Sequence, residues 1–434
     1  MLLLLVLIMM FLTAFFFKLG KGSLLFVPFL VSGTFLFSSW LDYMYQDTWA
    51  LPMHLDTISV IVWAIFCLAV GSFIARYAFK EAPRFVTQDQ LTAIREHEFY
   101  ISPVIYWPII SILCIFLYFT SQEFYFLAQR YTDSTSLGHQ IGALINELQY
   151  GNVQFSRWNS YRFVFFEAIA YTFTLAFIYN VKFHGFHYRY LKFLFPTLFY
   201  MMAIIYTAGR QDFIYYSIFL LVSWLFLDEY VYGYTQKRIF RRLSVIIVIF
   251  LFFVTLFLIS GLLSGKINSV FSIFRVLAHY GGTNISAFDL FLHRYYPDSA
   301  YIGTLTLPGV YAKLTYWGLP KMNVYITDFA FFDGISTNVY TALRRYIQDY
   351  GIVGMSIIMF ILGYIYTFFY QLCYKSKLSL WKVLLFSKYL FPIFLLCREE
   401  RFMTTIISTT TIYVIVVMWF IFRFLLQYRR DNVR

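Results

Sequence analysis

Charged side chains are scarce in this chain of 434 residues: Asp, Glu, Lys and Arg make up 13% of it, while 60% of the residues are hydrophobic. A soluble chain of this size carries about a quarter charged residues, so the composition excludes an ordinary soluble domain. The apolar residues form runs near the ~20 residues that a helix needs to cross a bilayer. These runs are continuous, whereas the strands of a transmembrane β-barrel alternate apolar and polar residues. The sequence therefore predicts an all-α polytopic membrane protein.

Cysteine is also scarce, with four residues in the chain. Cys67, Cys114, Cys373 and Cys397 lie within or at the ends of apolar runs and lack the spacing of a metal site. We expect them to be small core side chains without a disulfide. The chain also lacks an HExxH pattern, a P-loop and a GxGxxG fingerprint. The sequence therefore predicts no metal, no nucleotide and no other cofactor.

Eleven apolar segments predict eleven transmembrane helices within one domain, 1–434. They cover residues 1–17, 23–41, 57–75, 103–120, 163–181, 193–208, 213–230, 243–262, 351–371, 380–397 and 402–422. Lys and Arg gather in the connections that follow the odd-numbered segments. Because cytoplasmic loops are enriched in these residues, we expect the N-terminus outside and the C-terminus in the cytoplasm. The net charge of +12 follows this distribution and is not a nucleic-acid signal.

The predicted external loop 263–350 is far longer than the other connections. Loops of this length are usually functional. Two of its segments, 269–280 and 284–296, have amphipathic helical spacing, and 336–350 resembles a third helix with Ser, Thr or Asn at its start. Their composition is too hydrophobic for a solvated linker. We expect these helices to lie on the membrane surface.

Arginine is concentrated at the predicted external face. Such residues lie in the turn 208–212, in the long loop and in the turn 398–401: Arg210, Arg275, Arg294, Arg344, Arg345, Arg398 and Arg401. An arginine fork binds phosphate oxygens bidentately and stays charged at any physiological pH. A group of arginines can therefore stabilise a diphosphate leaving group, the role that a metal ion has elsewhere. This pattern suggests a glycan carried on a polyprenyl diphosphate as the substrate.

Several of these residues also have purely structural interpretations. Arg345 and Asp349 are four residues apart, so they can form a surface pair on one helix face. Arg210 can anchor a span end by snorkelling, and Arg294 can contact lipid headgroups. The charged turn 398–401 can pair internally, through Glu399 and Glu400.

The remaining candidates are histidines and uncharged polar residues. His279 and His293 lie in the long loop and can act as general bases, or can simply be interfacial; His54 is a weaker candidate. Tyr340 and Asn338 can hydrogen-bond sugar hydroxyls or cap a helix. The residues alone do not decide between these alternatives.

The stretch Thr337–Gly354 matches the pattern T-N-x-Y-T-x-x-R-x-x-x-x-D-(F/Y)-G-x-x-G nearly residue for residue. It resembles the bacterial O-antigen and capsule repeat-unit polymerases of the Wzy type. Two shorter segments, Gly209-Arg210 and Tyr280 to Asp289, resemble parts of the same family. By similarity, Arg344, Asp349 and Arg210 fall on matching positions. Arg345 departs from the family pattern, where many relatives have proline.

The resemblance implies a membrane glycosyltransferase of the C class in the bacterial inner membrane, with its site on the periplasmic side. Such enzymes move a growing glycan from undecaprenyl diphosphate to the non-reducing end of a new lipid-linked repeat unit, without metal or nucleotide. Arginines would hold the diphosphate, and Asp349 or a histidine would orient or deprotonate the acceptor. We therefore expect a catalytic set (Arg210, Arg275, His279, Arg344, Asp349) and a substrate-binding set (His293, Arg294, Asn338, Tyr340, Arg345, Arg398, Arg401).

The expected partners are the lipid-linked oligosaccharide, membrane lipid, and a chain-length regulator and flippase of the same pathway. Three alternatives stay open. An O-antigen ligase would pass the glycan to lipid A core. A lipid-linked oligosaccharide flippase is a transporter, and such proteins tend to have two related halves and charges inside the bundle. Here the predicted spans show no such halves, and their interiors are almost free of charge, with Glu167 and Lys388 as exceptions. A non-catalytic scaffold of an assembly complex is the third.

Overall fold

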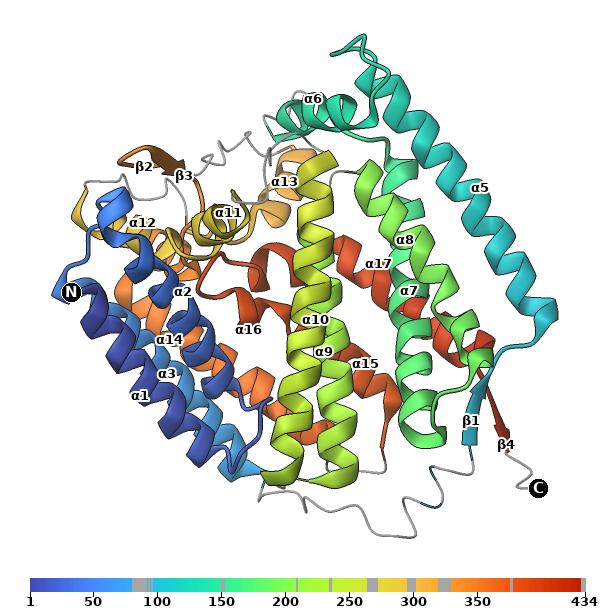
Figure 1. Ribbon diagram of the computed structural model, residues 1–434, viewed down its shortest axis with the longest axis horizontal. Coiled ribbons are helices and arrows are strands. Elements are labelled where there is room, and N and C mark those ends of the chain that lie inside the picture. Colours follow the sequence, from blue (N-terminus) through green and yellow to red (C-terminus); the bar gives the residue numbers. More distant parts are fainter. Residues whose placement is uncertain are drawn as a thin grey trace. The chain divides into compact units, whose positions relative to one another are not determined.

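The computed structural model describes residues 1–79, 92, 94, 97–149, 153–207, 210–233, 236–263, 272–294, 302–318, 329–374 and 378–430. The chain divides into two compact units, and each is assembled from separate stretches of sequence. Unit 1 comprises residues 1–83, 274–376 and 389–411, and unit 2 comprises residues 84–273, 377–388 and 412–434. Both units are mainly helical (Figure 1).

Unit 1 contains four long helices and several short elements. The long helices are α1 (Leu2–Leu19), α2 (Val27–Trp49), α3 (Leu55–Ala78) and α14 (Ala342–Tyr374). The short ones are α11 (Ser272–Gly281), α12 (Asn284–His293), α13 (Pro308–Tyr316), α16 (Phe391–Leu395), a π-helical turn (Phe402–Ile406), and the strands β2 (Ala330–Phe332) and β3 (Ile335–Thr337). The two strands pair antiparallel, with Ala330 opposite Thr337. Helix α1 packs along α2, and α3 packs along α14 (Figure 1).

Glycines allow α3 and α14 to approach until their backbones touch. A Cβ atom on Gly71 would lie 2.0 Å from the carbonyl oxygen of Phe360, and one on Gly363 would lie 1.9 Å from that of Leu68. The hydroxyl of Ser72 also donates a hydrogen bond of 3.1 Å to the Gly363 carbonyl. Small residues permit such close contact between membrane helices, where van der Waals packing drives association.

Helix α14 is broken at Gly351, whose φ of 69° and ψ of −178° are not helical. A positive φ is readily adopted by glycine and disfavoured for residues with a Cβ. The break separates a polar segment, Ala342–Tyr350, from the apolar segment that follows. It falls at the boundary that the sequence predicts between the external segment 336–350 and the span 351–371.

Unit 2 is built around α7 (Arg157–His184), which packs against α8 (Phe195–Tyr206) and α9 (Arg210–Tyr232). Its other elements are β1 (His97–Tyr100), α5 (Pro103–Ala128), α6 (Leu137–Gln149), a 3-10 helix (Tyr188–Phe193), α10 (Gln236–Leu263), α15 (Leu380–Tyr389), most of α17 (Thr409–Phe420), a π-helical turn (Ile421–Leu425) and β4 (Gln427–Arg430). Strands β1 and β4 pair antiparallel, with His97 opposite Arg430.

Six helices among the described residues are long and apolar enough to cross a membrane: α1, α3, α5, α7, α9 and α14. This confirms the predicted all-α membrane protein. The count of eleven spans and the orientation remain predictions. Helix α8 has only 12 residues, and the predicted span 380–397 is divided into α15 and α16.

Helix α12 is enclosed by unit 1, although the sequence predicts that 284–296 lies on the membrane surface. Its first six residues, Asn284–Asp289, are all buried. The Ser38 hydroxyl of α2 donates to the Asn284 amide oxygen at 3.0 Å, and the Asn284 amide donates to the Cys397 carbonyl. A Cβ on Gly282 would lie 3.1 Å from that of Leu41, so the preceding turn also sits against α2. The expectation of an interfacial helix is therefore wrong for α12, because its polar residues find partners inside the unit.

Candidate functional site

Four segments of unit 1 meet at the start of α14. The Ala342 N–H donates to the Leu396 carbonyl at 2.9 Å, which joins α14 to the segment after α16. The Arg345 guanidinium donates to the Leu305 carbonyl at 3.2 Å, which joins it to the turn before α13. The fourth segment is α12, whose Phe291 ring centre lies 5.2 Å from the Arg344 guanidinium carbon. The stretch Thr337–Gly354 therefore lies where these four segments of unit 1 meet.

Arg344 is buried and held by aromatic rings. Only 3% of its surface is exposed, and its guanidinium carbon lies 3.9 Å from the centre of the Tyr340 ring. Tyr340 is buried as well. Stacking uses the planar face of a guanidinium, whereas its hydrogen bonds leave from the edge. The structure thus gives Tyr340 a role that the sequence did not indicate, which is to orient Arg344.

The turn 398–401 contributes two further arginines. Arg401 forms an ion pair of 2.5 Å with Glu399, so the internal pairing predicted for this turn is confirmed. The Arg398 guanidinium carbon lies 6.0 Å from the centre of the Tyr280 ring of α11. Burial raises the pKa of the Glu399 carboxyl, but Arg401 and Arg398 outweigh it and hold this pKa below its usual value. Glu399 is therefore ionised at neutral pH.

Glu400 has a different role in the same turn. It is buried, and its carboxylate accepts hydrogen bonds from the Met403 N–H at 2.6 Å and the Thr404 N–H at 3.0 Å, at the start of the π-helical turn. The Tyr346 hydroxyl donates to it at 3.3 Å. Burial raises the pKa of the Glu400 carboxyl, although the Met403 and Thr404 N–H groups and Arg345 act in the opposite direction.

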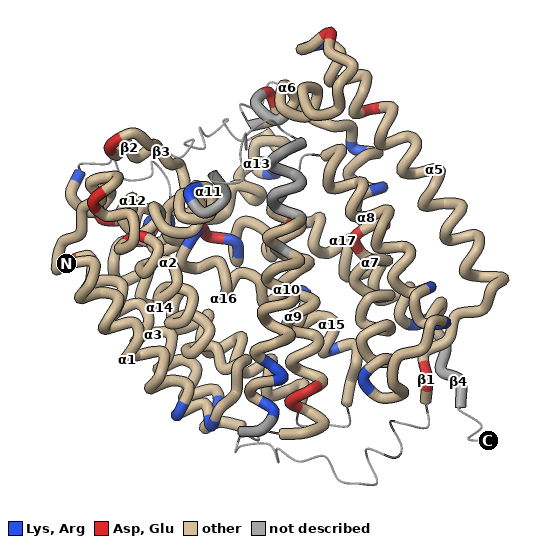
Figure 2. The backbone as a smooth tube through the Cα atoms, in the orientation of Figure 1, with Lys and Arg blue, Asp and Glu red and all other residues tan. Residues whose placement is uncertain are grey.

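Arg344, Arg345, Arg398 and Arg401 form what we term the arginine cluster. Arg345 interacts electrostatically with Glu400, Arg401, Glu399 and Arg344, which makes the group one network. Blue and red segments meet beside α16 in Figure 2. The group contains four arginines and two glutamates, Glu399 and Glu400, and Arg401 forms the ion pair with Glu399. The arrangement therefore carries excess positive charge and is chemically suited to bind a polyanion such as a diphosphate.

Asp349 holds a turn of unit 1 through hydrogen bonds. It is buried, and its Oδ2 accepts hydrogen bonds from the Thr306 N–H and hydroxyl, both at 2.8 Å, and from the Leu305 N–H at 3.1 Å. The expected Arg345–Asp349 pair is replaced by contacts of both side chains with the 305–306 turn. These contacts make Asp349 an anchor for the turn, and its predicted role toward an acceptor hydroxyl remains a prediction.

One ring nitrogen of His279 is fixed by a backbone carbonyl. Its Nε2 lies 2.8 Å from the Ser336 carbonyl of β3, and a carbonyl only accepts, so Nε2 carries the hydrogen. In the neutral ring, Nδ1 then holds the lone pair that can accept a proton. The His279 ring centre lies 5.2 Å from that of Tyr280, the residue whose ring neighbours Arg398. His279 therefore borders the arginine cluster.

The other predicted residues lie outside this cluster. Arg275, Arg294 and Asn338 are exposed. Arg210 is the first residue of α9 in unit 2, and its side chain lies outside the described part of the structure. The joint role of Arg210 and Arg344 remains a prediction.

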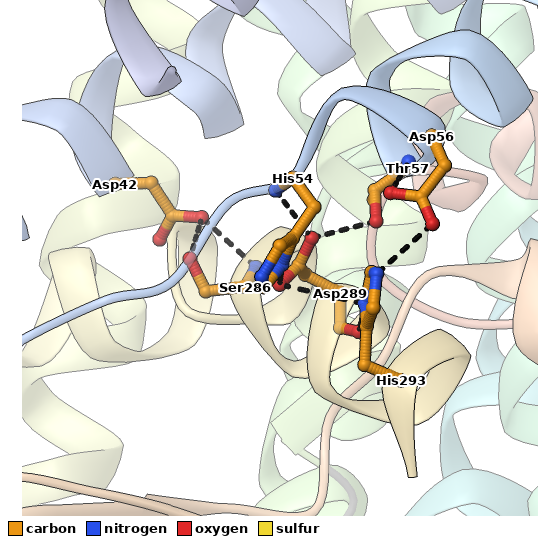
Figure 3. Close-up of polar contacts among 7 residues, drawn as sticks. All are labelled: Asp42, His54, Asp56, Thr57, Ser286, Asp289 and His293. Atoms are coloured by element: carbon orange, nitrogen blue, oxygen red, sulfur yellow. Dashed lines mark hydrogen bonds and ion pairs between the residues drawn. The ribbon is translucent and has the colours of Figure 1, made fainter.

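A second polar group joins the start of α3 to α12 (Figure 3). The His54 ring donates to the Asp289 carboxylate at 2.8 Å, and the His54 and His293 ring centres lie 4.0 Å apart. His293 places Nδ1 2.8 Å from the Asp289 carbonyl and Nε2 2.9 Å from the Asp56 carboxylate. The Asp289 carbonyl, first, and the Asp289 and Asp56 carboxylates raise the pKa of His293. With an acceptor at each nitrogen, His293 is not a free base of the kind predicted.

The sequence alone does not reveal this group, because its members are far apart in the chain. Only the spacing of Asp289 and His293 gives a local signal, since residues four apart share one helix face. Asp42 lies in the same region, where its carboxylate accepts from the Ser286 N–H and hydroxyl at 3.1 and 3.0 Å (Figure 3).

Comparisons of the chain with protein-family models, with curated proteins and with solved structures find no match. The interpretation of the arginine cluster therefore depends on its own chemistry.

Proposed function

We propose that this protein is a glycosyltransferase of the repeat-unit polymerase type in the bacterial inner membrane. It transfers a growing glycan from undecaprenyl diphosphate to the non-reducing end of a new lipid-linked repeat unit, for O-antigen, capsule or another polysaccharide. The observation that carries the proposal is the arginine cluster, which gathers around the motif Thr337–Gly354 and couples Arg344 and Arg345 with Arg401 and Arg398.

The cluster matches the charge that develops in such a reaction. When the bond between sugar and lipid diphosphate breaks, negative charge builds on the departing oxygen, and fixed cations lower the energy of that transition state. Arg344 is buried and stacked on Tyr340, so little reorganisation is needed to present its edge. The arginines supply the positive charge, and the transfer step is proposed to proceed without a metal at this cluster.

The proposed chemical step balances as a single displacement. The acceptor hydroxyl oxygen attacks the anomeric carbon and forms the new glycosidic bond. The bond from that carbon to the diphosphate oxygen breaks, and its electron pair leaves with the undecaprenyl diphosphate. The hydroxyl proton passes to a base, and attack from the opposite face inverts the anomeric configuration. Nδ1 of His279 is our candidate for this base, because Nε2 is occupied by the Ser336 carbonyl.

Asp349 supports this arrangement indirectly. It holds the 305–306 turn through its carboxylate, and Arg345 reaches the same turn through the Leu305 carbonyl. The aspartate of the motif is thus proposed to be a positioning residue for the cluster.

The flippase alternative receives less support from the buried charges of unit 2. Lys388 and Glu167, which stand inside predicted spans, form an ion pair with each other, and the Lys388 ammonium lies 3.9 Å from the centre of the Tyr171 ring. Paired in this way, the two side chains neutralise each other. A ligase would use the same displacement with a different acceptor, so only the acceptor distinguishes it.

The test uses purified full-length protein and a synthetic undecaprenyl-diphosphate repeat unit, without nucleotide sugar, and resolves the products on a gel. We expect a ladder. Arg344→Ala should reduce its rate by about 10²–10³-fold, the effect of removing one preorganised charge donor. Arg344→Lys should restore little, because an ammonium neither stacks nor forks like a guanidinium.

Arg130→Ala is the matched control, because Arg130 also stacks on an aromatic ring, at 4.6 Å from Phe126, but is exposed and belongs to unit 2. Its ladder should equal that of the wild type. An unchanged ladder with Arg344→Ala would refute the role of the cluster. No ladder with a cognate substrate, together with movement of that lipid across a liposome bilayer, would replace the polymerase with a flippase, and transfer only to lipid A core would indicate a ligase.

A further inference from the structure

Three potential metal ligands converge where α3 begins. His54 immediately precedes α3, and Asp289 and His293 lie one turn apart on the same face of α12 (Figure 3). One ligand atom from each residue lies within 4.8 Å of the others. In a tetrahedral zinc site with bonds of ~2.0–2.1 Å, ligand atoms stand about 3.3 Å apart. The observed separations, from 2.8 Å between His54 Nδ1 and Asp289 Oδ2 upward, bracket that value and need only small side-chain shifts.

The surrounding hydrogen bonds orient these ligands as a metal site requires. Asp289 Oδ1 accepts from the Thr57 hydroxyl at 2.6 Å and from the His54 N–H at 2.8 Å, which turns Oδ2 toward the two rings. The Nδ1–H of His293 donates to the Asp289 carbonyl at 2.8 Å, and Nδ1 lies 4.0 Å from Asp289 Oδ2. Nε2 lies 2.9 Å from the Asp56 carboxylate, so it is the nitrogen that would bind an ion together with Asp56. Metal-binding histidines and carboxylates are characteristically held by such outer contacts.

The charge of the group also fits a divalent ion. Asp289 is completely buried, and a buried carboxylate needs a cationic or hydrogen-bonding partner. The Asp56 carboxylate lies 2.9 Å from His293 Nε2 and is 65% exposed, so it can rotate to become a fourth ligand. Two carboxylates and two neutral imidazoles balance one divalent cation, and this donor set suits zinc.

We propose that His54, Asp289 and His293, with Asp56 as the fourth ligand, bind one zinc-type divalent ion. The ion would fasten the loop between α2 and α3 to α12. Helix α12 in turn carries Phe291, which packs beside Arg344, and Asn284, which donates to the Cys397 carbonyl. The metal would therefore stabilise the position of α12 beside the arginine cluster without contacting substrate.

The experiment measures metal on the full-length protein, purified in detergent with a tag that contains no histidine. The protein is stripped with a chelator, reloaded with Zn²⁺ or Co²⁺, and analysed for bound metal and for Co²⁺ absorption. We expect one ion per chain and the intense visible bands of tetrahedral cobalt. His293→Ala and Asp289→Asn should each weaken Zn²⁺ binding by at least about 100-fold, since even outer contacts contribute 10–100-fold.

His54→Ala provides a variant that does not disturb the core, because the His54 side chain is 54% exposed. Zinc should raise the melting temperature of the wild type and not that of His54→Ala, because only a native-state ligand stabilises by mass action. His139→Ala is the control, since His139 is an exposed histidine of unit 2, and it should bind zinc like the wild type.

Two results would overturn the proposal. One is that the wild-type protein binds no zinc, so that it does not differ from the His54→Ala/His293→Ala double variant. The other is stoichiometric zinc that persists in the double variant, because the ion would then lie elsewhere. Neither result depends on a glycan substrate, so the metal site and the polymerase activity are tested separately.

Discussion

The contacts of Asp349 predict that Asp349→Asn destabilises unit 1 by about 3 kcal/mol. Three donors converge on Oδ2: the Thr306 N–H, the Thr306 hydroxyl and the Leu305 N–H. An asparagine side-chain oxygen in the same position can accept the same hydrogen bonds, but this acceptor is uncharged. A hydrogen bond to a charged group contributes about 1.5–3 kcal/mol and a neutral one about 0.5–1.5, so each of the three loses about 1 kcal/mol. The new amide also points a donor toward the Leu305 N–H, which lies 3.3 Å from Oδ1.

The assay is SDS-driven unfolding of purified protein in mixed micelles, followed by circular dichroism. Asp333→Asn is the matched control, because Asp333 is an exposed aspartate of unit 1 in the β2–β3 turn. It should change the free energy of unfolding by less than about 0.5 kcal/mol, as surface substitutions usually do. Polymer synthesis by Asp349→Asn should fall only in proportion to the loss of folded protein.

The opposite pattern would refute this reasoning. If Asp349→Asn unfolds like the wild type but makes no polymer, then the carboxylate acts on the substrate, as the family resemblance implies, and the 305–306 turn is not its main partner.

Three further predictions follow from the packing and the chemistry of the units. Gly363→Ala should lower the melting temperature, because its Cβ would lie 1.9 Å from the Leu68 carbonyl and force α3 away from α14. Gly309→Ala is the control and should leave the melting temperature unchanged, because a Cβ there meets nothing within 4 Å. Burial raises the pKa of Glu400, so its contribution to stability is present below the unfolded pKa and is lost as the pH rises through the folded one. Glu400→Gln should therefore flatten the fall in melting temperature between acidic and neutral pH, and an unchanged slope would contradict this. His279→Asn should reduce polymerisation by about 10²–10⁴-fold and remove the acidic limb of the pH–rate profile while leaving lipid binding intact; a retained limb would exclude His279 as the base.

The sequence predicted the membrane class and one important boundary because both depend on local composition. Polar residues give way to apolar ones at Gly351, and the helix breaks there. The helices α11 and α12 were also predicted from their spacing. Their environment was not, because amphipathic spacing does not distinguish a membrane surface from a protein groove lined by polar groups such as Asp42 and Ser38.

The candidate site was only partly predictable, for the same reason. The sequence identified the arginines by type and by loop, but their proximity depends on contacts such as that between Ala342 and Leu396. The partner of Asp349 could not be predicted, because the 305–306 turn has no distinctive pattern. Likewise, His54 and Asp289 become neighbours only through the docking of α12 against the start of α3.

The interleaving of the two units has a consequence for biosynthesis. Unit 1 requires residues 389–411, and unit 2 requires β4 to pair with β1, so each unit needs segments that are synthesised after most of the other unit. Helix α3 will therefore exist before its main partner, α14, has been synthesised. During that interval, insertion machinery and lipid must shield surfaces that the finished protein buries, and a chain interrupted before residue 389 would leave both units incomplete at once.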